Sequence, residues 1–283
     1  MDCLFSTLIG SYYLALAGSL FSLNGLIVVI LMTDKQFKTS SYKIITNLCI
    51  ACMIQLSSQV VGGVMTLSQS VYNYYLDRIF GIVIQSGWFL YEGITLTLAV
   101  NRLMVFTCPK PIGNTITNLL LSLSWILWVT TAVILSLPSF GVTYEHDDLL
   151  YLWFYDTSAG STTLYSIEPY FDMSIFAIVF VVYLMVVGYI VKVSTESSKA
   201  EMRILVVAIV SFFYDSFFTI WCFWGPTNLM DETSTFIVFN SSWIIECGLF
   251  AALMPIFNAA VKKKIVGMFK RNKKVVVSTV IPF

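Results

Sequence analysis

Seven long apolar stretches restrict the folds open to this chain more than any other feature of its sequence. They run over about 8–32, 42–67, 80–106, 116–138, 169–191, 202–224 and 236–257. About 20 helical residues cross the hydrocarbon core of a bilayer, and only helices or closed barrels satisfy every backbone polar group there. The stretches lack the alternation of barrel strands. We predict an all-α bundle of seven transmembrane helices over 1–260, followed by a tail over 261–283.

The composition excludes an ordinary water-soluble domain. Hydrophobic residues make up 58% of the chain and charged residues only 11%, whereas soluble domains carry about 25% charged residues. The first apolar stretch has no basic residue before it and is too long for a signal peptide. We therefore expect it to remain in place as the first spanning helix.

The basic residues indicate how the bundle is oriented. Fifteen of the sixteen lysines and arginines fall in the tail or in the connections after the first, third and fifth stretches, and only Arg78 falls opposite. Since cytoplasmic loops are enriched in Lys and Arg, we expect an extracellular N-terminus and a cytoplasmic C-terminus. Within the tail, 261–274 mixes apolar and basic residues, which is typical of an amphipathic helix on the inner leaflet; a plain stop-transfer anchor remains open.

The 139–168 connection is the longest and carries a mixture of aromatic and acidic residues. Two interpretations are open. The aromatic side chains could form an interfacial belt in the membrane, or the segment could cover a ligand pocket. The residues concerned are Tyr144, Glu145, Asp147, Asp148, Tyr151, Trp153, Phe154 and Tyr155.

Nothing in the sequence points to catalysis. The chain has a single histidine, His146, without a partner, and its six cysteines form no Cys/His cluster typical of a metal site. No glycine-rich phosphate loop is present. We therefore expect no enzyme activity, no metal, no cofactor and no nucleic-acid partner.

Three acidic residues lie near the middle of predicted spans, namely Glu92, Asp215 and Glu246. Ionisable residues at this depth are costly and usually face the bundle interior. They could be protonated and hydrogen-bonded to neighbours, or they could form a site for a cation, an amine or a proton. An all-acidic pocket favours a cationic or hydrogen-bond-donating ligand, but protonation would remove that preference.

The third stretch carries a polar face at helical spacing, formed by Gln85, Trp88, Glu92, Thr95, Ala99 and Arg102. A face of this kind belongs against other helices rather than against lipid. We predict that Gln85, Trp88, Glu92, Asp215 and Glu246 contribute to a ligand pocket, and that the face connects this pocket to the inner surface at Arg102.

The segment LAVNRL (98–103) resembles the inner end of helix 3 in rhodopsin-type G-protein-coupled receptors. Combined with SSYKIITNL (40–48), it resembles the nematode serpentine chemoreceptors, with classes XA and T nearest. Trp125 and the MPIFN segment (254–258) resemble the same receptors more weakly. The resemblance implies a plasma-membrane receptor, in a sensory cilium, that binds a small molecule and couples to a heterotrimeric G protein through Asn101 and Arg102. Alternatively, Arg102 is simply an interfacial cation that extends toward the lipid surface.

Several features depart from the wider superfamily. Cys52 stands where the superfamily has an aspartate, which puts a sodium site in doubt. The 68–79 and 139–168 connections contain no cysteine, so the usual outer disulfide is missing. The last stretch has no lysine for a retinal Schiff base. The alternative to a receptor is a transporter or channel that uses the mid-membrane acids, although transporters tend to show repeats and broken helices.

Overall fold

The computed structural model describes residues 2–145, 151–193, 199–225 and 231–278. Over this part of the chain, seven helices are long and apolar enough to cross a membrane, which confirms the predicted all-α bundle. They are α1 (Asp2–Thr33), α2 (Ser40–Ser68), α3 (Tyr74–Thr107), α4 (Lys110–Leu135), α5 (Ala159–Val193), α6 (Lys199–Trp224) and α7 (Glu232–Phe257). A short 3-10 helix, η1 (Lys35–Phe37), follows α1, a hairpin of β1 (Val142–Glu145) and β2 (Leu152–Tyr155) precedes α5, and α8 (Ala259–Ser278) follows α7.

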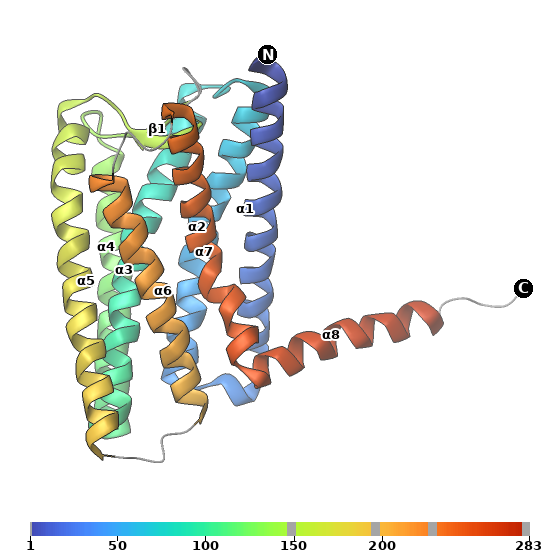
Figure 1. Cartoon of the computed structure of the whole chain (residues 1–283), viewed down its shortest axis with the longest axis vertical. Helices are drawn as coiled ribbons and strands as arrows, with labels where there is room; N and C mark the ends of the chain where they lie inside the picture. Colours follow the sequence, from blue (N-terminus) through green and yellow to red (C-terminus); the bar gives the residue numbers. More distant parts are fainter. Residues whose placement is uncertain (1, 146–150, 194–198, 226–230, 279–283) are drawn as a thin grey trace, which may run out of the picture.

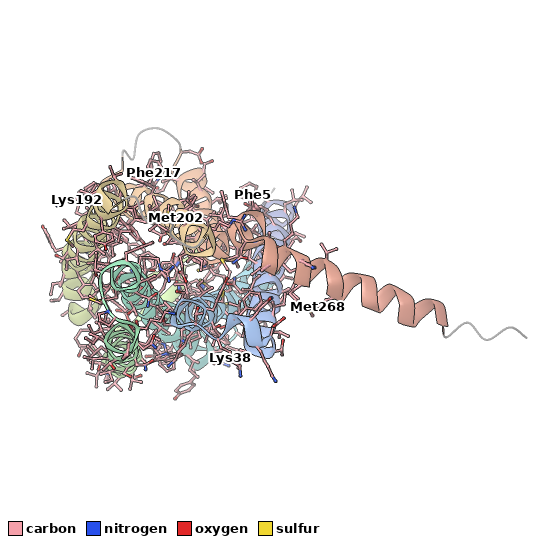
Figure 2. The ribbon with its side chains drawn as sticks, turned by 90° about the horizontal axis from the view of Figure 1, so that it is seen from below. Phe5, Lys38, Lys192, Met202, Phe217 and Met268 are labelled. Atoms are coloured by element: carbon pink, nitrogen blue, oxygen red, sulfur yellow. The ribbon has the colours of Figure 1, made fainter. Side chains whose placement is uncertain are left out.

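The helices run side by side, and the hairpin lies at the same end of the bundle as the N-terminus (Figure 1). We call this the hairpin end, and we call the opposite end, where α3 finishes, the Arg102 end. Seen from the Arg102 end, α8 leaves the bundle sideways (Figure 2). α8 is anchored by an ion pair between Lys264 and Asp34, and its side chains from 269 onward lie outside the described part.

The surface of the bundle is apolar, as lipid requires. Phe217 points outward from α6 (Figure 2) and is 65% exposed. Ile126, Val133 and Leu184 on other helices are also exposed. An apolar surface of this extent would promote aggregation of a soluble monomer. In a bilayer these side chains contact lipid tails, which are equally apolar.

α5 begins ten residues earlier than the expected start at 169. A start at 169 would put Pro169 in the first turn of the helix, where proline is favoured. Instead, Pro169 lies inside α5, where neighbouring helices tolerate the break in backbone hydrogen bonding. The extra turns matter because they bring Glu168 and Asp172 into the interior of the bundle, where they are 6% and 0% exposed.

The hairpin is packed into the bundle rather than spread over the membrane surface. Its antiparallel register pairs Val142 with Tyr155 and Tyr144 with Trp153. Tyr144 and Trp153 are both buried, and the hydroxyl groups of Tyr144 and Thr66 lie 2.6 Å apart. The belt interpretation is therefore wrong for these two rings. β1 approaches α3 so closely at Gly81 that any Cβ there would overlap the carbonyl group of Val142.

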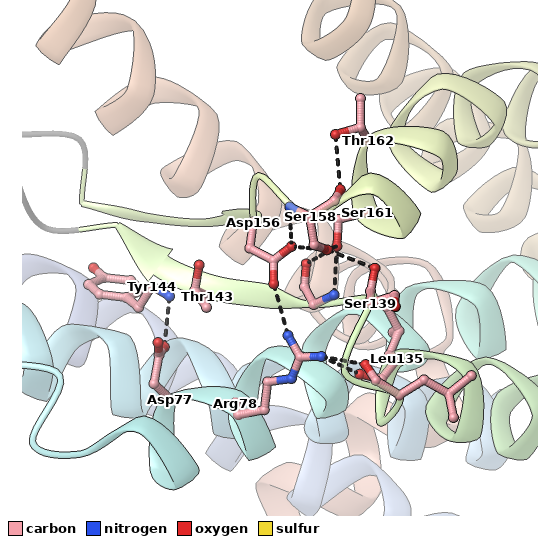
Figure 3. A network of polar contacts seen from close by, with 12 residues as sticks. Asp77, Arg78, Leu135, Ser139, Thr143, Tyr144, Asp156, Ser158, Ser161 and Thr162 are labelled. Carbon is pink, nitrogen blue, oxygen red and sulfur yellow. Dashed lines mark hydrogen bonds and ion pairs between the residues drawn. The ribbon is translucent and has the colours of Figure 1, made fainter.

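Two adjacent α3 residues fasten the hairpin to the bundle (Figure 3). Asp77 accepts a hydrogen bond of 2.7 Å from the Tyr144 backbone N–H. Arg78 donates to Asp156 at 3.0 Å, and to the carbonyl groups of Leu135 and Leu137 at 3.1 and 2.8 Å. These carbonyl groups, at and just after the end of α4, have no partner in the helix and lie at its negative pole, where a cation is favoured. We call these contacts of Asp77 and Arg78 the hairpin clamp.

The clamp holds Asp156 in its ionised form. Partial burial opposes ionisation, but hydrogen bonds from Ser158 and Ser161 and the Arg78 guanidinium outweigh it, so the pKa of the Asp156 carboxyl lies below its usual value of 3.8. The clamp joins α3 to the connection before α5, and no cysteine stands in the 139–168 connection. It therefore makes by ionic contacts a link for which the wider superfamily uses a disulfide.

We predict that Arg78→Ala loosens the hairpin without unfolding the bundle. The change removes the Arg78 hydrogen bonds to Asp156 and to two carbonyl groups, and hydrogen bonds to charged groups contribute about 1.5–3 kcal/mol each. Amide hydrogen exchange in β1 and β2 should rise, while exchange in α1 and α2 should stay unchanged. Arg203→Ala, which removes an exposed arginine, is the control, and unchanged exchange in the hairpin of Arg78→Ala would refute the clamp.

The clamp should also resist mild acid. Because the pKa of Asp156 is lowered in the folded state, its stabilisation is fully present above the ordinary value of 3.8 and is lost as the pH falls through the lowered value. We expect hairpin exchange, corrected for its intrinsic pH dependence, to be constant down to about pH 5 and to increase only below about pH 4. Asp156→Asn should remove this transition, and a transition near neutral pH would contradict the assignment.

Candidate functional site

The polar face of α3 is buried throughout, as its spacing predicted. Gln85 and Trp88 are 5% exposed, Glu92 is 1% exposed and Arg102 is fully buried. α3 packs against α2, α4, α5 and α6, so its polar side chains face other helices at every level. The face therefore forms a continuous polar interior that reaches from the hairpin end to the Arg102 end.

A pocket with about 790 Å³ of space free of protein atoms lies at the hairpin end, between the hairpin and α3, α5, α6 and α7. Residues 152–155 of the hairpin form part of its wall, which supports the interpretation of this segment as a cover over a pocket. Gln85 and Trp88, two of the predicted pocket residues, line it. The remaining wall is largely aromatic, with Phe218 and Phe223 from α6 and Trp243 from α7.

Two acids from α5, Glu168 and Asp172, also line the pocket. Gln85 donates to Glu168 Oε1 at 2.6 Å, and the Tyr155 hydroxyl donates to Glu168 Oε2 at 2.7 Å. Burial and the neighbouring Glu168 raise the pKa of Tyr155 well above its usual 10, so the phenol remains a donor at physiological pH. Sequence reasoning missed both acids, because they precede and follow Pro169 in what reads as the start of a helix.

Trp88 lies where the pocket meets the centre of the bundle. Its indole nitrogen donates to Asp172 Oδ2 at 3.4 Å. Its ring is in edge contact with Phe218 and Trp243, with centroids 6.3 and 6.2 Å away, and is stacked on Tyr91 at 6.1 Å. Trp88 therefore touches α5, α6 and α7 at once, and a molecule in the pocket that moves this ring would act on all three helices.

The three acids predicted from the sequence do not line the pocket. Glu92, Asp215 and Glu246 are each 1% exposed and are absent from its wall. The Tyr91 hydroxyl donates to Asp215 Oδ2 at 2.8 Å, which joins α3 to α6 in mid-membrane. The carboxyl groups of Asp215 and Glu246 face one another, as do those of Glu92 and Asp172. Carboxyl groups that face one another cannot both be charged without a large repulsion, so we expect each pair to carry at most one negative charge.

At the opposite end, Arg102 is fully buried and forms an ion pair with Glu201 in the first turn of α6. It also donates to Ser41 and, at 2.7 Å, to the Asn101 side-chain oxygen. The Asn101 amide donates to Thr117 on α4 at 3.0 Å. The alternative of an interfacial cation reaching toward lipid is therefore wrong. Arg102 is instead the centre of a polar cluster that joins α2, α3 and α6.

The short motifs noted in the sequence meet in space at this end. Asn258, which closes α7, donates to the Tyr42 hydroxyl at 2.9 Å, and Trp125 on α4 donates to Asn47 on α2 at 3.0 Å. Ser41, from the same segment of α2, contacts Arg102. The motifs are thus the contact residues of a single interface. His146, Asp147 and Asp148 lie outside the described residues.

Comparisons with known proteins agree with this geometry. Among solved structures, the chain is similar to the crystal structure of squid rhodopsin, with a TM-score of 0.70 at 12% identity over 100% of this chain and 93% of that one. At this identity the likeness concerns the fold alone. No curated protein sequence matches the chain. The sequence profile of the family described as "Serpentine type 7TM GPCR chemoreceptor Srt" matches residues 5–278, which selects class T from the two classes that the sequence resembles. The chain therefore belongs to the Srt family of serpentine seven-transmembrane G-protein-coupled chemoreceptors.

Proposed function

We propose that this multi-pass membrane receptor binds a small molecule from the extracellular side and activates a heterotrimeric G protein from its cytoplasmic side. The basic residues in the connections at the Arg102 end support a cytoplasmic position for that end, and the hairpin end is then extracellular. We further propose that the receptor resides in the plasma membrane, in a sensory cilium. Membership of a family of non-enzymatic receptors favours this function over the transporter or channel considered from the sequence.

The observation that carries the proposal is the placement of two sites on one helix. α3 lines the pocket with Gln85 and Trp88 at the hairpin end, and it carries the buried Arg102 at the other end. Its buried polar face connects them. A receptor needs this arrangement, because a ligand can act on a distant partner only by shifting the equilibrium between two packings of the same helices.

α6 is the element that the proposed ligand moves. It is held to α3 in mid-membrane by Tyr91 and Asp215, and at its first turn by Arg102 and Glu201. Phe218, on the same helix, touches the Trp88 ring at the pocket floor. A ligand that displaces these rings would tilt α6 about its mid-membrane contact and separate Glu201 from Arg102. In the packing seen in this structure, Arg102 is enclosed and unable to meet a partner.

We predict that Arg102→Ala abolishes ligand-driven G-protein activation while the receptor still reaches the cell surface. Glu201→Gln should do the opposite and raise signalling without ligand. Glutamine still accepts the hydrogen bond but has no charge, and the Glu201 side chain is 21% exposed, so the cost is smaller than that of about 3–5 kcal/mol for a fully buried pair. This cost falls on the packing in which Arg102 is enclosed. Both variants can be measured in cells with a G-protein reporter and a surface-expression assay.

Arg203→Ala serves as the control for both variants, because it removes an exposed charge on the same helix. Normal signalling by surface-expressed Arg102→Ala would remove the reason for assigning G-protein coupling to this residue. Unchanged basal signalling by Glu201→Gln would show that the ion pair does not restrain α6.

For the mid-membrane contact, we predict that Asp215→Asn leaves the response nearly unchanged and that Asp215→Leu raises basal activity. The amide oxygen still accepts the hydrogen bond from Tyr91, whereas leucine cannot. Hydrogen bonds between membrane helices average about 0.6 kcal/mol and reach about 1.7, so the basal shift should be about 3-fold to 20-fold. Amide variants of Glu92 and Glu246 should likewise preserve the response if these acids only pack the bundle. Altered ion flux in any amide variant would instead support the channel hypothesis.

A further inference from the structure

The charged side chains in the pocket wall are acidic. Glu168 and Asp172 both contribute to its wall, but no lysine or arginine does. Arg78 on α3, which holds the hairpin, is engaged with Asp156 and two carbonyl groups. Burying a carboxylate without a counter-charge costs free energy. A positively charged group on a ligand would reduce this cost.

Asp172 has hydrogen-bonding capacity that no donor uses. Although it is fully buried, its Oδ1 receives no hydrogen bond from an N–H or O–H donor among the described residues. The group facing it from α3 is a second carboxyl, Glu92, whose two oxygen atoms also lack a donor. Thr219, in the pocket wall and 1% exposed, has an unpaired hydroxyl as well. Buried polar atoms are paired in most proteins, so the unpaired atoms of Asp172 and Thr219, which line the pocket, point to a polar group that is missing from it.

The rest of the wall suits an apolar cation. Trp88, Trp243 and Phe218 surround the same space, and aromatic faces attract cations as well as apolar groups. Bare metal ions are a poor match, because no three acidic, thiol or imidazole groups in the described part of the chain are placed to hold one.

From this geometry we infer that the ligand is an organic amine whose ammonium group binds Asp172, with Glu168 beside it, and whose aromatic body packs against Trp88, Trp243 and Phe218. The inference rests on the proposed function only in taking this pocket as the receptor's ligand site. Tyr155 and Gln85 hold both oxygen atoms of Glu168, so Asp172, with its free oxygen, is the primary contact. An ammonium group donates up to three hydrogen bonds, which suits the unpaired atoms of Asp172 and Thr219.

The test uses the purified full-length receptor in lipid nanodiscs and two sets of probe compounds. Within each set the aromatic ring is the same and only the polar group differs. One set is 2-phenylethylamine, 2-phenylethanol and 3-phenylpropanoate, and the other is tryptamine, indole-3-ethanol and indole-3-propanoate. We expect the amine of at least one set to raise the thermal midpoint and to bind about tenfold or more tightly than its alcohol, since buried charge-assisted contacts are strong. The carboxylates should not bind. Equal binding of alcohol and amine, preferred binding of a carboxylate, or no binding by either amine would overturn the inference.

Variants then locate the contact. Asp172→Asn should reduce amine affinity to that of the alcohol and leave alcohol binding unchanged, whereas Glu168→Gln should have a smaller effect. Glu232→Gln, which removes an exposed acid at the same end of the bundle, is the control and should bind the amine as the wild type does. If Asp172→Asn does not fold, the comparison of amine with alcohol in the wild type still decides the ligand class.

Binding in nanodiscs involves no G protein, so the two proposals can fail separately. A receptor that binds amines but does not signal would contradict the proposed function alone. One that signals to neutral or acidic compounds and ignores amines would contradict the ligand class alone.

Discussion

A helix that carries polar and ionisable side chains along one face can cross a bilayer only if other helices cover that face. α3 is such a helix, and much of the architecture follows from its need for cover. α2, α4, α5 and α6 pack around it. Each of these neighbours brings polar groups to it, such as Thr117 on α4, Glu168 on α5 and Asp215 on α6. The pocket and the Arg102 cluster are thus two levels of the same buried polar interior.

Buried charged groups are paired differently at the two ends of this interior. At the Arg102 end the cation is paired with Glu201 and donates to the neutral acceptors Ser41 and Asn101, although its Nε has no partner among the described residues. At the hairpin end the acids have donors from Gln85, Trp88 and Tyr155 but no cation. At one end the buried charge is therefore paired with an opposite charge of the protein, and at the other end the described residues supply no such partner. A difference of this kind lets binding at one site change the stability of contacts at the other.

The hairpin clamp makes the pocket possible. β1 and β2 form a two-stranded sheet, which is marginally stable on its own. Asp77 and Arg78 tie it to α3, and Gly81 lets it come close enough to bury Tyr144 and Trp153. Three aromatic residues of the hairpin, Trp153, Phe154 and Tyr155, thereby contribute to the pocket wall. An ionic link of this kind can open and close more readily than a disulfide.

The sequence by itself determined the seven spans, because hydropathy over about 20 residues is a local property. It also determined the buried face of α3, from Gln85 to Arg102, because helical periodicity is local. Only the tertiary structure decided which groups meet. Glu201 lies 99 residues from Arg102 in the chain, and Glu168 became a pocket residue because α5 extends through Pro169 and is covered by the hairpin. Charge pairing and pocket walls depend on contacts between distant segments, and no periodicity in a single segment encodes them.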